Sequence, residues 1–327
     1  MLHRRRFVAA LPLLAMPLAA IGQASTLPVI GYLNGRGAAD SALVIAAFRE
    51  GLKEAGFVDG QNVVIESRFA EGQSDRLPAL AAELVARKVN VFVATNGTAS
   101  VLKARPVVPE TTPIVFAMGG DPVKLGVVAS LGRPGGNITG VTFLVNQLGS
   151  KSISLLHEMV PKVTTMGFLF NPADPNAQSD LRDAQEAASK LKLKLVPGQA
   201  SNPNELETAF ASLAKQKVGA LFVATDPSFG FHKAVLIRLA ARHAIPAIYG
   251  LREFATAGGL MSYGTSITDA NRQLGVYTGR ILKGAKPADL PVMQSMRFEL
   301  IVNRKTANAL KLAIPQTILL QATEVLE

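Results

Sequence analysis

The strongest constraint on the fold of this 327-residue chain is a strand and loop sequence that occurs twice, about 130 residues apart. Phe92–Thr95 and Phe222–Thr225 both read Phe-Val-Ala-Thr, and they are followed by Asn96 and Asp226. Two more pairs of similar segments recur in the same order, namely Gly31–Leu33 with Gly167–Leu169 and Thr112–Phe116 with Ile245–Tyr249. The repetition predicts two similar α/β lobes with a cleft between them.

Short apolar runs alternate with helical patterns along the whole chain, which indicates βαβ units and parallel sheets. In the first half we predict strands at 28–33, 62–66, 90–94, 113–117 and 138–143, helices at 41–55 and 75–88, and a short helical turn at 121–130. In the second half we predict helices at 150–159, 176–191, 204–217, 233–243, 268–282 and 305–312. The strands predicted there are 166–170, 194–197, 220–224, 247–249, 260–263 and 298–302.

The helix at 268–283 and the tail after it exceed what two simple five-strand halves need. We therefore predict that the chain crosses back, so that this helix completes lobe one and the tail completes lobe two. The predicted domains are a signal peptide at 1–24, lobe one at 27–143 plus 266–293, and lobe two at 144–265 plus 294–327. Several crossings would form a hinge.

The first 24 residues have the pattern of an export signal. Arg4–Arg6 form a basic start, Phe7–Ile21 form an apolar stretch broken by two prolines, and Gly22–Ala24 supply small residues near a cleavage site. Arg4–Phe7 also fits the R-R-x-F core of a twin-arginine signal, so Sec and twin-arginine export both stay open, as does an N-terminal helix that is retained. The mature protein is expected in the periplasm.

Composition narrows the possible partners. The formal charge is +10, and removing the three signal arginines leaves 31 basic against 24 acidic residues, or +7. The basic residues are scattered, and the sequence has no arginine-rich arm, zinc finger or aromatic RNA-binding motif, so no nucleic-acid partner is expected. Cysteine is absent, which excludes disulfides and a lipid anchor on cysteine. We expect a free monomer.

Motifs for enzymatic chemistry are weak. Gly35 and Gly37 follow the first strand, but the third glycine of a dinucleotide fingerprint would fall at Asp40. The segment is therefore read as a flexible loop, or as a ligand loop in which Arg36 binds a carboxylate. No P-loop or nucleophile elbow occurs, and His232 and His243 would lie about 16 Å apart along a helix, too far to share a metal. We expect no catalytic residue, metal or cofactor.

Polar and aromatic residues at the carboxyl ends of the predicted strands are the best candidates for a binding site, because parallel α/β sheets bind ligands there. The candidates are Asn34, Arg36, Thr95, Asn96, Gly97, Thr98, Met118, Asp121, Asn171, Asn176, Asp226, Phe229, Tyr249, Glu253 and Tyr263. The alternative is that these are ordinary turn and helix-cap residues.

Several short motifs, spread over nearly the whole mature chain, resemble one family. They are Phe48–Leu52, Gly119–Val123, Arg133–Gly140, Ala224–Pro227, Gly258–Gly264 and the tail from Asn303 to Pro315. As a set they are similar to the substrate-binding proteins of bacterial ABC importers, in the family that includes tryptophan-binding members. The resemblance implies two Rossmann-like lobes of the type I periplasmic-binding architecture, three crossings, closure on a small ligand and docking to a membrane permease.

The expected mechanism is a clamp in which a ligand that contacts both lobes stabilises the closed form. Asn34, Thr95, Asn96 and Asp121 would form the first wall, and Asn171, Asp226, Tyr249 and Glu253 the second. An amino acid or a small organic acid fits this mixture, with Asp226 or Glu253 holding an ammonium and Arg36 a carboxylate. A ligand sensor without transport and an exported hydrolase are the alternatives.

Overall fold

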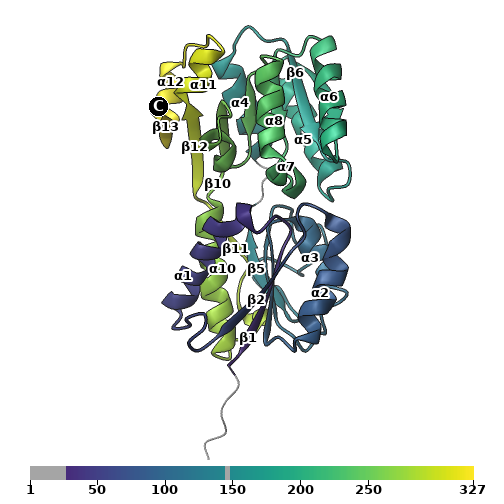
Figure 1. Ribbon diagram of the computed structural model, residues 1–327, viewed down its shortest axis with the longest axis vertical. Coiled ribbons are helices and arrows are strands. Elements are labelled where there is room, and N and C mark those ends of the chain that lie inside the picture. Colours follow the sequence, from purple (N-terminus) through teal and green to yellow (C-terminus); the bar gives the residue numbers. More distant parts are fainter. Residues whose placement is uncertain (1–26, 144–147) are drawn as a thin grey trace, which may run out of the picture.

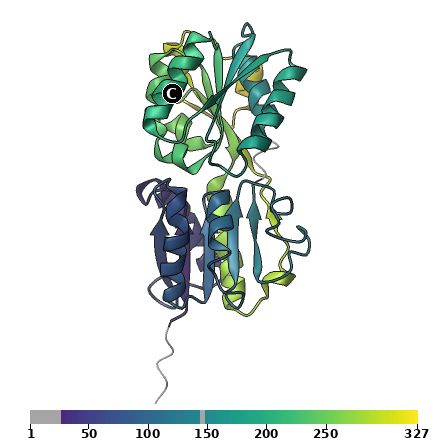
Figure 2. The same cartoon turned by 90° about the vertical axis from the view of Figure 1, so that its right-hand side faces the viewer.

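Two α/β lobes are stacked along the long axis of the molecule (Figures 1 and 2). The computed structural model describes residues 27–143 and 148–327. The predicted signal peptide at 1–24 therefore lies outside the described residues. In the part of the chain that is described, no helix is both long and apolar enough to cross a membrane.

The sheet of lobe one has the strand order β11-β5-β4-β3-β1-β2, and all its pairings are parallel. Its strands are β1 (Val29–Asn34), β2 (Val64–Phe69), β3 (Val91–Thr95), β4 (Ile114–Met118), β5 (Ile138–Thr142) and β11 (Met293–Gln294). The inner strands β1, β3, β4 and β5 are almost completely buried, whereas the edge strand β2 is partly exposed and carries Glu66, Ser67 and Arg68.

The sheet of lobe two has the order β13-β12-β10-β9-β8-β6-β7, and only the β10–β12 pairing is antiparallel. Its strands are β6 (Thr165–Phe170), β7 (Lys194–Gln199), β8 (Ala220–Val223), β9 (Ala247–Tyr249), β10 (Met261–Thr265), β12 (Phe298–Asn303) and β13 (Glu324–Leu326). The first Phe-Val-Ala-Thr segment lies within β3, and the second begins in β8 and continues past its end at Val223. These two strands occupy equivalent positions in the two sheets.

Helices cover both faces of each sheet. In lobe one they are α1 (Ala42–Glu54), α2 (Leu77–Ala86), α3 (Thr98–Ala104) and α10 (Ile267–Leu282). In lobe two they are α4 (Gly149–Met159), α5 (Ala177–Lys190), α6 (Pro203–Lys215), α7 (Pro227–Phe231), α8 (Lys233–Arg242), α9 (Arg252–Thr256), α11 (Arg304–Ala309) and α12 (Gln316–Gln321).

Alternation along β1 shows how the core of lobe one is divided. Tyr32 points to the face that is covered by Phe48 of α1 and Leu274 of α10. Leu33 points to the opposite face, where it joins the cluster that contains Leu84 of α2. The period of two along the strand therefore supplies a separate apolar layer to each side of the sheet.

The chain passes between the lobes three times, between β5 and α4, between β10 and α10, and between β11 and β12. The helix after β10 packs on lobe one, where it lies against α1, and the chain then returns to the second sheet. The two mainly parallel sheets and three crossings confirm the predicted α/β architecture. The domain boundaries, set to single residues from the sequence, stay a prediction.

Short elements are where the sequence prediction was incomplete. It missed α3, α7, α9, α12, β11 and β13, all of seven residues or fewer. Residues 121–130, predicted as a helical turn, form hydrogen-bonded turns in which the Asp121 carboxylate accepts from the amides of Val123 and Lys124. Elements this short have too few residues to display a period.

Candidate ligand-binding site

A cavity of about 60 Å³ lies between the lobes, at the carboxyl ends of the central strands. Six of the sequence candidates line it: Arg36, Asn96, Gly97, Thr98, Asn176 and Asp226. The remaining lining residues are Gly119, Phe143, Asp174, Thr225, Pro227, Leu251 and Ile267. The residues that follow the two repeated segments, Asn96 and Asp226, thus reach the same cavity from opposite lobes.

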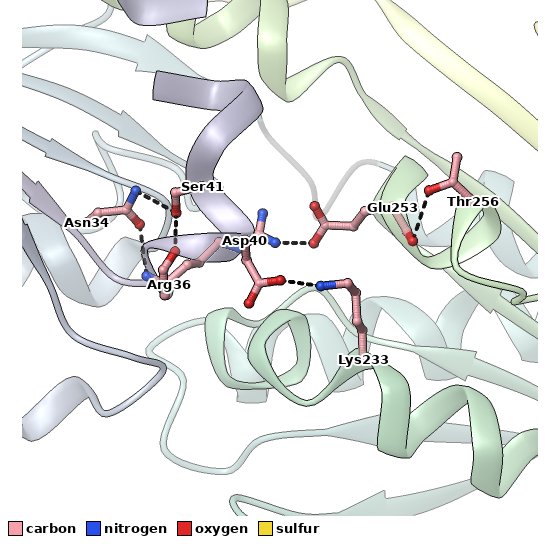
Figure 3. Close-up of polar contacts among 8 residues, drawn as sticks. Asn34, Arg36, Asp40, Ser41, Lys233, Glu253 and Thr256 are labelled. Carbon is pink, nitrogen blue, oxygen red and sulfur yellow. Dashed lines mark hydrogen bonds and ion pairs between the residues drawn. The ribbon is translucent and has the colours of Figure 1, made fainter. Parts of the chain in front are cut away.

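Arg36 crosses from lobe one towards lobe two. Asn34 fixes the loop by accepting a hydrogen bond from the Arg36 amide at 2.9 Å, and it donates to Ser41 Oγ at 3.0 Å. The Arg36 guanidinium forms an ion pair with Glu253 of α9 (Figure 3). Arg36 is only 4% exposed, and its Nε has no hydrogen-bond partner among the described residues.

Two further contacts join the lobes around the cavity. Asp40 in the loop before α1 forms an ion pair with Lys233 at the start of α8 (Figure 3). Asn176 of lobe two donates a hydrogen bond to Thr98 Oγ1 of lobe one at 2.9 Å. These contacts exist only when the lobes stand close together.

Asn96 follows β3 in the left-handed backbone region, with a φ of 55°, which asparagine adopts more readily than most residues. Its side chain is buried, with 7% of the residue exposed, and Nδ2 lacks a partner in the described part of the chain. Buried donors in folded proteins are nearly always paired. The Asn96 amide and Arg36 Nε are therefore free to bind an acceptor in the cavity.

Asp226 faces these donors from lobe two. It is the N-cap of α7, and its Oδ1 accepts from the amides of Ser228 at 2.8 Å and Phe229 at 3.3 Å. Ser228 Oγ and Asn171 Nδ2 also donate to the same oxygen, at 2.6 and 3.3 Å. The cap thus uses one carboxylate oxygen, and it accounts for the presence of Asp226 independently of any ligand.

Asp174, which the sequence candidates did not include, is the second carboxyl group in the cavity. It lies in the loop after β6, next to the loop of Asp226, because β6 and β8 are neighbouring strands. Burial raises the pKa of Asp174 to about 8, and the negative charge of Asp226 adds to the shift.

Several sequence candidates lie outside the cavity. Tyr249 stacks on Phe254 with a ring separation of 4.5 Å inside the core of lobe two. Met118 and Phe229 are core residues, and Tyr263 packs on the other core cluster of lobe two.

The polar candidates outside the cavity have other contacts. Thr95 donates to Asn271 Oδ1 within lobe one at 3.3 Å, and Asp121 lies in a groove beside the cavity. Asn34, Asn171 and Glu253 support cavity residues rather than lining it.

The cavity residues that the sequence reasoning missed are of two kinds. Thr225 ends the repeated segment and Asp174 lies between two candidates, Asn171 and Asn176, so position offered a signal for both. Phe143, Leu251 and Ile267 are apolar, and nothing in their local sequence separates them from core residues. No group of three histidine or carboxylate side chains in residues 27–143 and 148–327 is placed to hold a metal ion.

A family model described as "ABC transporter substrate binding protein" matches residues 39–326. A tyrosine-binding protein from Clostridioides difficile (strain R20291) is 25% identical over 263 residues, which cover 80% of this chain and 75% of that protein. An ABC domain from Streptococcus pneumonia solved in complex with L-Trp has a TM-score of 0.83 and 24% identity, over 92% of this chain and 100% of that one.

The ligand-free, open structure of a substrate-binding protein with adhesive properties from Clostridium difficile is also similar. Its TM-score is 0.66 and its identity 25%, over 92% of this chain and 99% of that chain. With its two lobes, three crossings and a family match over most of its length, the chain belongs to the ABC transporter substrate-binding proteins and has the type I periplasmic-binding fold.

Proposed function

We propose that this protein is the extracytoplasmic solute-binding component of an ABC importer, which binds an amino acid between its lobes and delivers it to a membrane permease. The observation that carries the proposal is the polarity of the cavity. Buried donors of Arg36 and Asn96 that have no partner among the described residues stand on one wall, and the carboxyl groups of Asp174 and Asp226 stand on the other. A zwitterion with one carboxylate and one ammonium complements both walls.

The ligand's side chain would lie against the apolar part of the cavity. Phe143, Leu251 and Ile267 line this part, near the crossings between the lobes. Burial of apolar surface at about 25 cal/mol per Å² would favour a large apolar or aromatic side chain over a polar one. The relatives that bind tyrosine and L-Trp support the same choice.

Delivery follows from closure. A ligand that contacts both walls adds its contacts only to the closed form, and so shifts the equilibrium between open and closed forms towards it. The protein would act as a monomer in the periplasm, carry no cofactor and catalyse no reaction. The permease would bind the closed form in preference to the open one.

The direct test is mass spectrometry of ligand retained by the purified protein, followed by calorimetry with that ligand and with L-tryptophan, L-tyrosine and L-leucine. We expect micromolar or tighter binding of at least one amino acid, accompanied by compaction in X-ray scattering. Binding without compaction would contradict the clamp. Turnover of a ligand during the titration would instead favour the hydrolase alternative.

A further inference from the structure

A second cavity, about 140 Å³ in volume, opens on the surface of lobe two between α8 and α11 (Figure 1). We call it the α8–α11 pocket. None of the residues that line it also lines the cavity between the lobes. Its floor is buried and includes Ile245, Ala247, Tyr249 and Leu260, whereas Ala241 at its rim is exposed. A small molecule can therefore enter it from solvent without any movement of the lobes.

The pocket exists because the residues around it have short side chains. Four of them are alanines of the two helices and of the loop after α8, and two are consecutive glycines before β10: Ala240, Ala241, Ala244, Ala309, Gly258 and Gly259. Protein interiors are close-packed, and voids much larger than a water molecule are few. An engineered apolar cavity of about 150 Å³ binds benzene. The α8–α11 pocket therefore has room for one six-membered ring.

The lining of the pocket favours a neutral molecule. None of the residues that line it carries a charge. The amides of Gly258 and Gly259 donate to the carbonyl oxygens of Ala255 and Phe254 at 3.1 and 2.8 Å, and Thr306 Oγ1 donates to the Gly258 carbonyl oxygen at 2.8 Å. Because these polar groups are already paired, an ion in the pocket would lose its water without gaining a partner, which costs free energy.

The hydroxyl of Tyr249 is the exception. Tyr249 is 1% exposed, and its ring stacks on Phe254 at a separation of 4.5 Å. A Cβ on Gly259 would lie 2.8 Å from Tyr249 Cε2, so the hydroxyl end of the ring reaches the glycines that line the pocket. No described residue forms a hydrogen bond with this hydroxyl, and burial raises the pKa of Tyr249. Buried polar side chains are nearly always paired. The unpaired hydroxyl therefore points to a ligand with one polar group.

We propose that the α8–α11 pocket is a second binding site, which takes a neutral molecule of one ring and one hydroxyl, such as a phenol, with the ligand's hydroxyl bonded to that of Tyr249. A tyrosine hydroxyl can donate or accept, so either direction of this hydrogen bond is possible. The ring would lie against Ile245 and the alanines. Because the two cavities share no residue, this site does not depend on the amino acid proposed for the cavity between the lobes.

A titration of the full mature chain with phenol, followed by methyl NMR, tests the site. Two isoleucines report on the two cavities, since Ile245 lines the α8–α11 pocket and Ile267 lines the cavity between the lobes. We expect phenol to shift the Ile245 methyl signals with a dissociation constant of about 1 mM or tighter, as suits a ligand of about seven non-hydrogen atoms. The Ile267 signals should stay in place.

Tyr249→Phe isolates the hydroxyl, because it keeps the ring that stacks on Phe254. It should weaken phenol binding by about 3–10-fold, the effect of one neutral hydrogen bond, while the affinity for benzene changes by less than about twofold. The thermal midpoint of the ligand-free variant should not fall, since the hydroxyl that is removed has no partner among the described residues.

Ala241→Leu fills the pocket from its rim and should weaken both phenol and benzene by at least about tenfold. Ala211→Leu in α6 is the matched control, because Ala211 is also an exposed alanine of a helix in lobe two but lies outside the pocket. It should bind both molecules as the unmodified protein does. The thermal midpoints of the two leucine variants show that each is folded.

Three results would overturn the site. The first is the absence of any Ile245 shift up to about 10 mM phenol, ten times the weakest dissociation constant expected. The second is unchanged phenol affinity in a folded Ala241→Leu variant. The third is a ratio of phenol to benzene affinity that is the same in Tyr249→Phe and the unmodified protein. None of these results bears on amino-acid binding between the lobes.

Discussion

Asn96 combines two properties that a single residue type rarely offers. Its backbone adopts the left-handed conformation that the turn after β3 requires, with a φ of 55°, and its side chain carries a buried amide donor into the cavity. Asparagine tolerates this backbone conformation better than other residues except glycine and aspartate. Aspartate therefore offers a substitution that keeps the turn and changes only the charge.

Asn96→Asp should lower the affinity for an amino acid by at least about tenfold, because a carboxylate would face the ligand's carboxylate in a poorly solvated cavity. Calorimetry gives the affinity, and the thermal midpoint of the ligand-free protein should fall, because the substitution adds a carboxyl group to a cavity that already holds Asp174 and Asp226. The exposed Asn308→Asp in α11 is the control for added charge alone. Unchanged affinity in Asn96→Asp would remove this residue from the carboxylate wall.

A single sequence reveals part of such a site at the level of its residues. The edge of the sheet was predictable, because polar residues follow buried strands there, and Asn96 and Asp226 were found in this way. The sequence does not reveal which residue at the end of a strand faces the cavity. Tyr249, for example, ends β9, but its side chain turns into the core and stacks on Phe254. Asp174 becomes significant only through Asp226, and that proximity depends on the pairing of β6 with β8.

Among the helices, the contact between α1 and α10 depends on glycines. A Cβ on Gly275 would lie 2.1 Å from the carbonyl oxygen of Phe48, and one on Gly51 would lie 1.8 Å from that of Arg272. Neither helix can move away, because both cover the same face of the first sheet. The spacing of the two helices therefore requires residues without side chains.

Gly275→Ala should destabilise the protein by about 3 kcal/mol or more, since the methyl group must displace backbone atoms rather than a flexible side chain. Denaturant unfolding followed by circular dichroism measures the loss. Gly132→Ala is the matched control, because Gly132 has open space around it and should stay within about 0.5 kcal/mol of the unmodified protein. Equal effects of the two substitutions would show that α1 and α10 can separate.

In the molecule as a whole, the ion pair between Asp40 and Lys233 joins the two lobes and favours closure, although neither residue lines the cavity. Asp40 and Lys233 belong to different lobes, and their side chains are 19% and 24% exposed. A partly buried pair of this kind contributes modestly and is weakened by salt. Ligand affinity should therefore depend on residues that the ligand never touches.

Lys233→Met should weaken ligand binding by about 2–10-fold and reduce its dependence on sodium chloride, while leaving the stability of each lobe unchanged. Calorimetry at low and high salt, in a double-mutant cycle with Asp40→Asn, isolates the pair. Arg238→Met is the control, since Arg238 pairs with Glu207 within lobe two. Additive effects in the cycle would mean that the pair makes no contribution to closure.

The position of α10 also determines when lobe one can fold during synthesis. Residues 27–143 carry five strands of the first sheet, but the helix that covers their α1 side is made only after most of lobe two. At roughly 5–20 residues per second, synthesis from residue 143 to the end of α10 takes about 7–28 s, and that face stays exposed on the growing chain for this time. A fragment of residues 27–143 should therefore bind a hydrophobic dye and lack protected amides, and adding α10 through a short linker should restore both. We therefore expect lobe one to reach its folded form only after α10 has been made.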